Sequence, residues 1–174
     1  NAISPVDFFS PAKQEAALAL IACPGAEVLT QQIAAPLVNW AKEAGVPTET
    51  FIIPSDCPRF QSGDAKGLVK ESVRGHDVFL VVDPGNYSLT YNLFGNVNHM
   101  SPDDHFANLK RLIQAVAGRA HRISVIMPSL YGGRQHRRIS RESLDCAVAL
   151  QELQQTGVSN IITFDAHDPR VVNA

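Results

Sequence analysis

The positive charge of this chain is concentrated in one segment. Four of its 15 lysines and arginines lie within eight residues: Arg134, Arg137, Arg138 and Arg141. Gly132 and Gly133 precede them and permit a tight turn, and the apolar run 123–127 before the glycines predicts a buried strand. A guanidinium presents a planar set of donors that matches two phosphate oxygens at once. The segment, with Gln135, therefore predicts a polyphosphate site at the end of a strand.

A second interpretation of the arginine segment needs no ligand. Arginines in a solvated loop often pair with acids nearby, which here are Glu142 and Asp145, or with carboxylates of another subunit. The sequence alone leaves both interpretations open.

Two polar residues follow the last predicted strand. Alternate residues of extended backbone point to the same side, so Asp165 and His167 can converge on one point. This arrangement permits a metal site or a proton-transfer role, although Mg²⁺ prefers oxygen ligands to histidine. The alternative is that Asp165 caps a turn and His167 makes a local hydrogen bond.

A third candidate is the glycine-containing loop 59–64. Phe60 can stack on a planar base, and Asp64 can accept a hydrogen bond from an amino group or a ribose hydroxyl. The alternative is a simple turn that binds nothing.

The composition restricts the function classes. The chain has 174 residues, 45 % of them hydrophobic, and a net charge of -2, which suits one globular domain and gives no indication of nucleic-acid or membrane binding. No apolar run reaches the ~20 residues of a membrane helix, and the start of the chain does not resemble a secretory signal. Three cysteines without metal-type spacing predict reduced thiols in a cytoplasmic protein.

Strands and helices are expected to alternate along the chain. The patterns predict strands at 17–22, 48–53, 68–71, 77–82, 123–127 and 160–164, and helices at 28–41, 101–116 and 143–155. The segment 87–100 has no convincing period and is expected to be a long loop. Because the strands lack polar alternation, we predict an α/β fold whose mainly parallel sheet has helices on both faces. Ligands of such sheets bind beyond the carboxyl ends of the strands, where the arginine segment follows its strand.

Several motifs, in this order, resemble the ribose-phosphate pyrophosphokinase (phosphoribosyl-pyrophosphate synthetase) family. They are the Phe-x-x-Gly-acid loop at 60–64, the run Glu-Ser-Val-Arg-Gly-His-Asp-Val-Phe at 71–79, helix residues 108–112, the turn 131–135 and the segment 161–167. The resemblance implies a phosphoribosyltransferase-like (type I) fold. It also implies an enzyme that transfers the β,γ-diphosphoryl group of MgATP to the 1-hydroxyl of ribose 5-phosphate.

The resemblance further implies roles for particular residues. Arg134 and Gln135 would contact ATP, and His167 would lie at the catalytic Mg²⁺. Phe60 and Asp64 would reach the ATP site of a neighbouring subunit, which implies a homo-oligomer. Three other arginines lack a direct match to an ATP-contacting position and are expected to bind a regulatory anion or another subunit: Arg137, Arg138 and Arg141.

The chain also departs from the family pattern. The family loop usually reads Phe-Pro-Asp-Gly-Glu, whereas here Ser62 replaces one carboxylate and the shorter Asp64 replaces the other. His136 stands where the family tends to have an aspartate. Family members carry two similar α/β domains, and residues 1–174 correspond to the first, so the ribose-5-phosphate-binding domain is expected to be absent. We therefore expect this chain alone to make no product; the alternative function is that of a non-catalytic, synthetase-associated relative.

Overall fold

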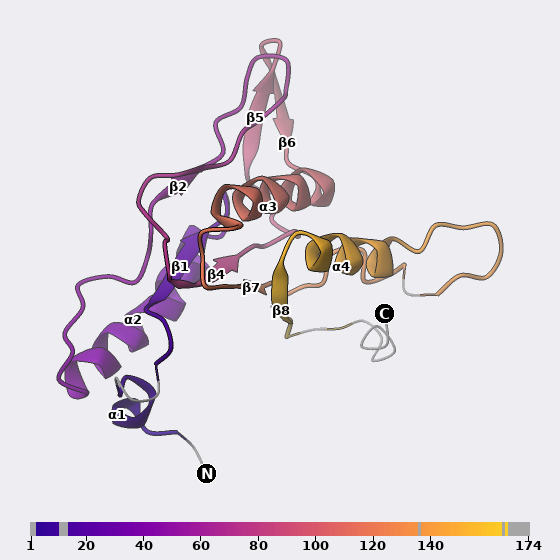
Figure 1. Ribbon diagram of the computed structural model, residues 1–174. Coiled ribbons are helices and arrows are strands. Elements are labelled where there is room, and N and C mark those ends of the chain that lie inside the picture. The colour runs from indigo at the N-terminus through magenta and orange to yellow at the C-terminus, as the bar shows by residue number, and fades with distance from the viewer. Residues whose placement is uncertain (1–2, 11–13, 136, 165, 167–174) are drawn as a thin grey trace.

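A four-stranded parallel sheet forms the centre of the protein (Figure 1). The computed structural model describes residues 3–10, 14–135, 137–164 and 166. The sheet has the order β1-β4-β7-β8, with β1 at Leu18–Ala22, β4 at Asp77–Val81, β7 at Arg122–Ile126 and β8 at Val158–Ile162. The last residues of the four strands are aligned, since Ala22 pairs with Val81, Val81 with Ile126 and Ile126 with Ile162. All four carboxyl ends therefore lie at one edge of the sheet.

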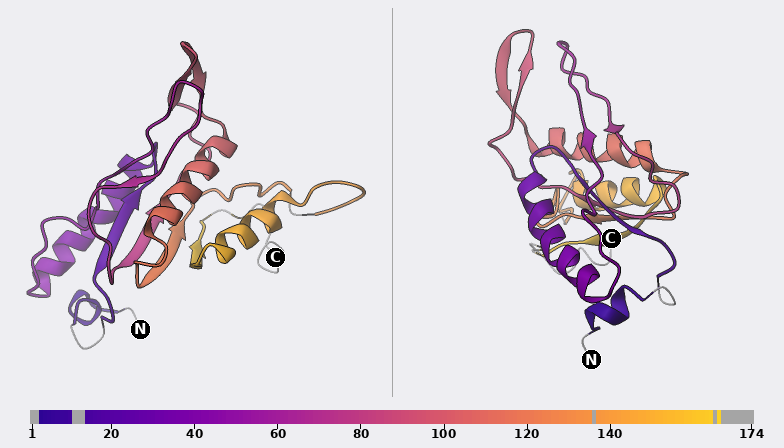
Figure 2. Two further views of the ribbon diagram at one scale, coloured as in Figure 1. Left: turned by 45° about the horizontal axis from the view of Figure 1, so that its top comes forward. Right: turned by 90° about the vertical axis from the view of Figure 1, so that its left-hand side faces the viewer.

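Helices cover both faces of this sheet, as the sequence predicts (Figure 2). Helix α2 (Glu27–Glu43) packs Ala34 and Ala41 against Leu20 on one face. Helices α3 (Pro102–Val116) and α4 (Asp145–Gln155) lie on the other face, where their buried side chains contact Ile21 and the alternate residues of β4 and β7. Neighbouring residues of one strand thus pack against helices on opposite faces of the sheet, because side chains alternate across a strand. The α/β fold class is confirmed.

Two small antiparallel pairs extend away from the sheet in the same direction (Figures 1 and 2). One consists of β2 (Ser55–Asp56) and β3 (Leu68–Val69), and the other is the hairpin of β5 (Thr90–Leu93) and β6 (Asn96–His99). The long loop expected at 87–100 is therefore wrong. The sequence pattern misses this hairpin because it packs against another loop, so no alternation of core and solvent residues marks it.

Two further expected strands differ from the structure. The segment 48–53 makes a single parallel bridge, between Ile52 and Leu20, because Pro47 and Pro54 flank it without N–H donors. The last strand begins earlier than expected and spans Val158–Ile162. A four-residue helix that the pattern does not predict, α1 (Pro5–Phe8), precedes the sheet, and Phe9 after it stacks on Phe51.

The structure bears on two predictions made from the composition, the state of the cysteines and the length of the helices. All three cysteines are buried free thiols. In the part of the chain that the structure covers, no helix combines the length and the apolar character needed to cross a membrane.

Gly67, directly before β3, lies close to the backbone of α3. A Cβ at this position would lie 2.6 Å from the carbonyl carbon and oxygen of Arg111 and 2.9 Å from the nitrogen of Leu112, all backbone atoms of α3. We predict that Gly67→Ala lowers the free energy of unfolding by about 1–3 kcal/mol, because a helix backbone has little room to move. Urea denaturation measures the loss.

Gly85→Ala is the matched control for this substitution. Its Cβ would make only an ordinary contact, 3.5 Å from Oδ1 of Asp83. An equal loss of stability in both variants would contradict the steric explanation.

Candidate functional site

A cavity of about 680 Å³ lies at the carboxyl edge of the sheet. Pro84 and Gly85 follow β4, the segment 129–135 follows β7, and Ala166 follows β8. The first turns of α3 and α4 complete the lining with Pro102, Asp103 and Asp145. Three adjacent strands thus contribute to one site, at the edge where parallel α/β sheets bind their ligands.

Tyr131 links the turn after β7 to α3. Its ring stacks on Phe106, with centroids 4.3 Å apart and planes 1° from parallel. Its hydroxyl donates a hydrogen bond to Oδ1 of Asp103 at 2.5 Å, and its backbone N–H donates to Sδ of Met127. The bond to Asp103, and then burial and nearby carboxylates, raise the pKa of Tyr131 to about 12. The phenol therefore stays protonated at neutral pH and keeps donating to Asp103.

The start of α3 is fixed by a capping box. Oγ of Ser101 accepts a hydrogen bond from the backbone of Asp104 at 3.2 Å, and the Asp104 carboxylate accepts one from the backbone of Ser101 at 2.9 Å. With Pro102 at the first helical position, this confirms the predicted start. Because α3 begins at Pro102, Asp103 and the positive end of the helix dipole both lie at the cavity.

The glycines of the arginine segment serve packing inside the protein. Gly132 adopts φ 67°, and a Cβ there would lie 3.1 Å from the backbone nitrogen of Cys146. The backbone of Gln135 donates to the carbonyl of Gly132 at 2.8 Å, which closes the turn. The close approach that glycine permits is thus to the first turn of α4. It sets Arg134 and Gln135 against the cavity.

The structure brings together only some of the predicted site residues. Arg134 and Gln135 line the cavity. Phe60 and Asp64 lie in the exposed loop between β2 and β3 and do not line it. Three predicted anion ligands are exposed in the loop before α4, also outside the lining: Arg137, Arg138 and Arg141. His167, the predicted metal ligand, is outside the described residues, whereas its neighbour Ala166 lines the cavity.

The described residues give no support to local ion pairing of the arginine segment. None of the ion pairs formed among them includes Arg134 or the three arginines that follow it. Glu142, one of the proposed partners, instead accepts a hydrogen bond from the backbone of Ile139 at 3.4 Å.

Asp103, Tyr131 and Asp145 line the cavity but are absent from the predicted site. The signal that identifies Asp103 is topological, since a helix that follows a parallel strand must begin at the carboxyl edge. Among the described residues no three histidines, cysteines or acids form a metal-binding group. Two carboxylates nevertheless suit Mg²⁺, which is usually held by one or two carboxylates together with substrate phosphates.

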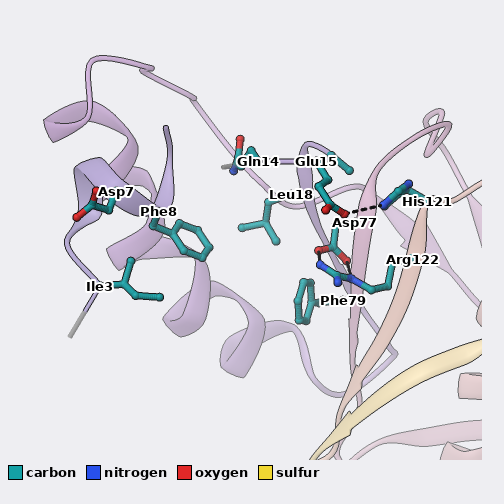
Figure 3. A pocket seen from close by; sticks show the side chains of 11 residues that line it. Ile3, Asp7, Phe8, Gln14, Glu15, Leu18, Asp77, Phe79, His121 and Arg122 are labelled. Atoms are coloured by element: carbon teal, nitrogen blue, oxygen red, sulfur yellow. Dashed lines mark hydrogen bonds and ion pairs between the residues drawn. The ribbon is translucent and has the colours of Figure 1, made fainter. Parts of the chain in front are cut away.

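A second cavity, of about 640 Å³, lies at the opposite edge of the sheet (Figure 3). It is lined by residues at the amino-terminal ends of β1, β4 and β7 and by the segment before β1, and four of its titratable side chains lie in two pairs. Arg122 bonds Asp77 at 2.5 Å, and His121 lies 3.7 Å from Glu15. Size does not separate the two cavities. Strand polarity and the position of Arg134 and Gln135 favour the cavity at the carboxyl edge as the candidate ligand site.

Comparison with known sequences identifies the family. A family model described as the N-terminal domain of ribose phosphate pyrophosphokinase matches residues 18–157. The chain belongs to this family. Ribose-phosphate pyrophosphokinase of Bacillus caldolyticus is 27 % identical over 115 residues, which cover 65 % of this chain and 32 % of that protein. Ribose-phosphate pyrophosphokinase 1 of Candida albicans is 29 % identical over 122 residues, which cover 69 % of this chain and 34 % of that protein. The chain spans about a third of the length of these relatives.

A solved structure shows the same fold. The structure of phosphoribosylpyrophosphate synthetase from Mycobacterium smegmatis superposes on this one with a TM-score of 0.68 and 22 % sequence identity. The match covers 90 % of this chain and 45 % of the chain in that structure. The fold is therefore that of the ribose-phosphate pyrophosphokinase N-terminal domain, which is phosphoribosyltransferase-like.

The Tyr131–Asp103 bond predicts a pH-dependent stability difference. Tyr131→Phe removes the bond and retains the ring stack, so it should cost about 0.5–1.5 kcal/mol at neutral pH. The pKa is raised from 10.0 to about 12 in the folded protein, so the contribution is complete below pH 10 and is lost as the pH rises toward 12. The gap between wild type and variant should close over that interval in urea denaturation.

Tyr87→Phe serves as the control, because that ring is exposed. A gap for Tyr131→Phe that stays constant to pH 12, or one equal to that of Tyr87→Phe, would contradict the assignment.

Proposed function

We propose that this chain is the nucleotide-binding part of an enzyme that transfers diphosphate from MgATP to ribose 5-phosphate, forming phosphoribosyl pyrophosphate for nucleotide biosynthesis. One observation carries the proposal: Arg134 and Gln135, the two residues that match the family's ATP-contacting pair, line a cavity at the carboxyl edge of the sheet. Family membership supports the reaction class.

The cavity has the chemical groups that this reaction needs. Diphosphoryl transfer requires little covalent participation by the protein and depends on neutralised charge and positioned oxygens. Arg134 offers paired N–H donors to phosphate oxygens, and the Gln135 amide can donate one more. The first turns of α3 and α4 add the positive ends of two helix dipoles.

Mg²⁺ fits this proposal as a cation held jointly by protein and nucleotide. When bound, it neutralises phosphate charge. Asp103 and Asp145 are the described carboxylates that line the cavity, and His167 is a further proposed ligand on the strength of the family match. Tyr131 keeps Asp103 oriented through its hydroxyl.

Phe60 and Asp64 are proposed to act on the nucleotide of a neighbouring subunit. Both are exposed, Phe60 to 54 %, and neither lines this chain's own cavity. This position supports a homo-oligomer with shared nucleotide sites. The three outer arginines would bind a regulatory anion or a subunit: Arg137, Arg138 and Arg141. A cytoplasmic location is part of the same proposal.

A non-catalytic relative is the second candidate. Ser62, which stands where the family has a carboxylate, donates a hydrogen bond to Oδ2 of Asp64 at 2.8 Å. The remaining carboxylate of the loop is thus partly engaged by the residue that replaces the missing one. The parent gene discriminates between the two candidates, because only the enzyme needs a following Asp-Asp-x-x-x-Thr-Gly-Gly-Thr-type loop for ribose 5-phosphate.

Arg134→Ala tests the nucleotide site. Loss of charge-assisted hydrogen bonds worth about 1.5–3 kcal/mol should raise the Kd for MgATP by about 10- to 100-fold, measured by calorimetric titration. Arg119→Ala removes an exposed arginine at the opposite edge of the sheet and should leave the Kd unchanged. Equal affinity of Arg134→Ala and wild type would contradict the proposed site.

The chain alone is expected to make no phosphoribosyl pyrophosphate from MgATP and ribose 5-phosphate. The physical reason is that the family's ribose-5-phosphate pocket belongs to the second domain. A coupled assay with a phosphoribosyltransferase measures the product, and detectable synthesis by the 174-residue chain would overturn this expectation.

A further inference from the structure

The charges that line the cavity at the carboxyl edge do not suit a bare polyphosphate. Among the described lining residues, Arg134 supplies a cation, whereas Asp103 and Asp145 supply two carboxylates. All three are exposed to solvent. The phosphates of an uncomplexed nucleotide would be attracted by one of these groups and repelled by two. A divalent cation between the carboxylates and the phosphates replaces both repulsions with attractions.

Asp103 makes a contact that helix capping does not explain. The capping box of α3 uses Ser101 and Asp104. Asp103 instead accepts the hydrogen bond of the Tyr131 hydroxyl, which lies 28 residues further along the chain. This bond engages Oδ1 of Asp103 at 2.5 Å, and the second oxygen of a carboxylate can accept a further partner. The carboxylate is therefore held by the turn after β7 while one oxygen is left for a ligand.

Tyr131 is itself fixed by contacts with the helices. Its ring stacks on Phe106 of α3 with planes 1° from parallel. The Lys110 ammonium lies 4.9 Å from the centroid of the same Phe106 ring and donates to Glu152 of α4 at 2.8 Å. A hydroxyl held in this way gives the carboxylate that it bonds one preferred direction. Hydrogen bonds of this kind orient carboxylates that bind metal ions in proteins.

We propose that Tyr131 is a positioning residue: through Asp103 it makes the cavity select a polyphosphate that carries a divalent cation over the same polyphosphate without one. The inference rests on the proposed function, because it concerns the nucleotide site at Arg134 and Gln135. Arg134 attracts phosphates in both cases, and Asp103 decides whether the cation must accompany them.

A purely structural role of the Tyr131–Asp103 bond has different consequences. If the bond only stabilised the turn, its loss would loosen Arg134 and Gln135 and weaken nucleotide binding with and without Mg²⁺. An oriented carboxylate acts in opposite directions on the two ligands, because it attracts the cation and repels bare phosphate. The sign of the change in affinity for the metal-free nucleotide therefore separates the two roles.

Calorimetric titration of the full chain with ATP, in excess Mg²⁺ and separately in EDTA at equal ionic strength, tests the proposal. Wild type should bind the magnesium complex at least about tenfold more tightly than free ATP. Asp103→Asn should raise the Kd for MgATP at least about fivefold and lower the Kd for free ATP. Tyr131→Phe should raise the Kd for MgATP about three- to tenfold and should not raise the Kd for free ATP.

Asp56→Asn is the matched control for the loss of a carboxylate. Asp56 is exposed and lies outside the lining of the cavity, so its replacement should change neither Kd. Thermal melting of each variant verifies that it is folded at the temperature of the titration.

An equal rise of both Kd values in Asp103→Asn or Tyr131→Phe would overturn the proposal in favour of a structural role. So would a wild-type chain that binds free ATP as tightly as MgATP. Nucleotide binding that Arg134→Ala weakens, with the preference for MgATP unaltered in Tyr131→Phe, would reject this inference alone and retain the proposed function. Failure of wild type to bind either form of the nucleotide would reject the proposed function and this inference with it.

Discussion

Parallel pairing of four strands is the constraint on which the rest of this structure depends. Parallel strands need crossover connections, and the helices of those crossovers bury both faces of the sheet. The same geometry brings the carboxyl ends of β4, β7 and β8 to one edge. The loops that follow these strands therefore meet, although the chain between Gly85 and Ser129 includes a hairpin and a whole helix.

The site at this edge is held by contacts that differ from those expected of a phosphate loop. Gly132 lines the cavity and also packs against the backbone at the start of α4. The Tyr131 ring on Phe106 and the Tyr131 bond to Asp103 connect the turn to α3. The turn that carries Arg134 and Gln135 is thus held against two helices.

The β5–β6 hairpin and the loop at 59–65 are held by other contacts than those of the core. They have few buried apolar residues, and their order comes from backbone pairing, the Arg59–Tyr91 contact and the hydrogen bond from Phe94 to Gln61.

The sequence by itself determined the α/β class, the main strands and the capped start of α3, because apolar runs and capping residues act locally. It also carried the resemblance to the family, and it predicted the pair Arg134 and Gln135, which the structure places in the lining of the cavity. Only the tertiary structure decided that Asp103 and Asp145 join that pair, since they are distant in the chain and meet through the strand register. The hairpin at 90–99 was likewise invisible to pattern analysis, because its packing partner is the loop at 59–65 and no core face marks its strands.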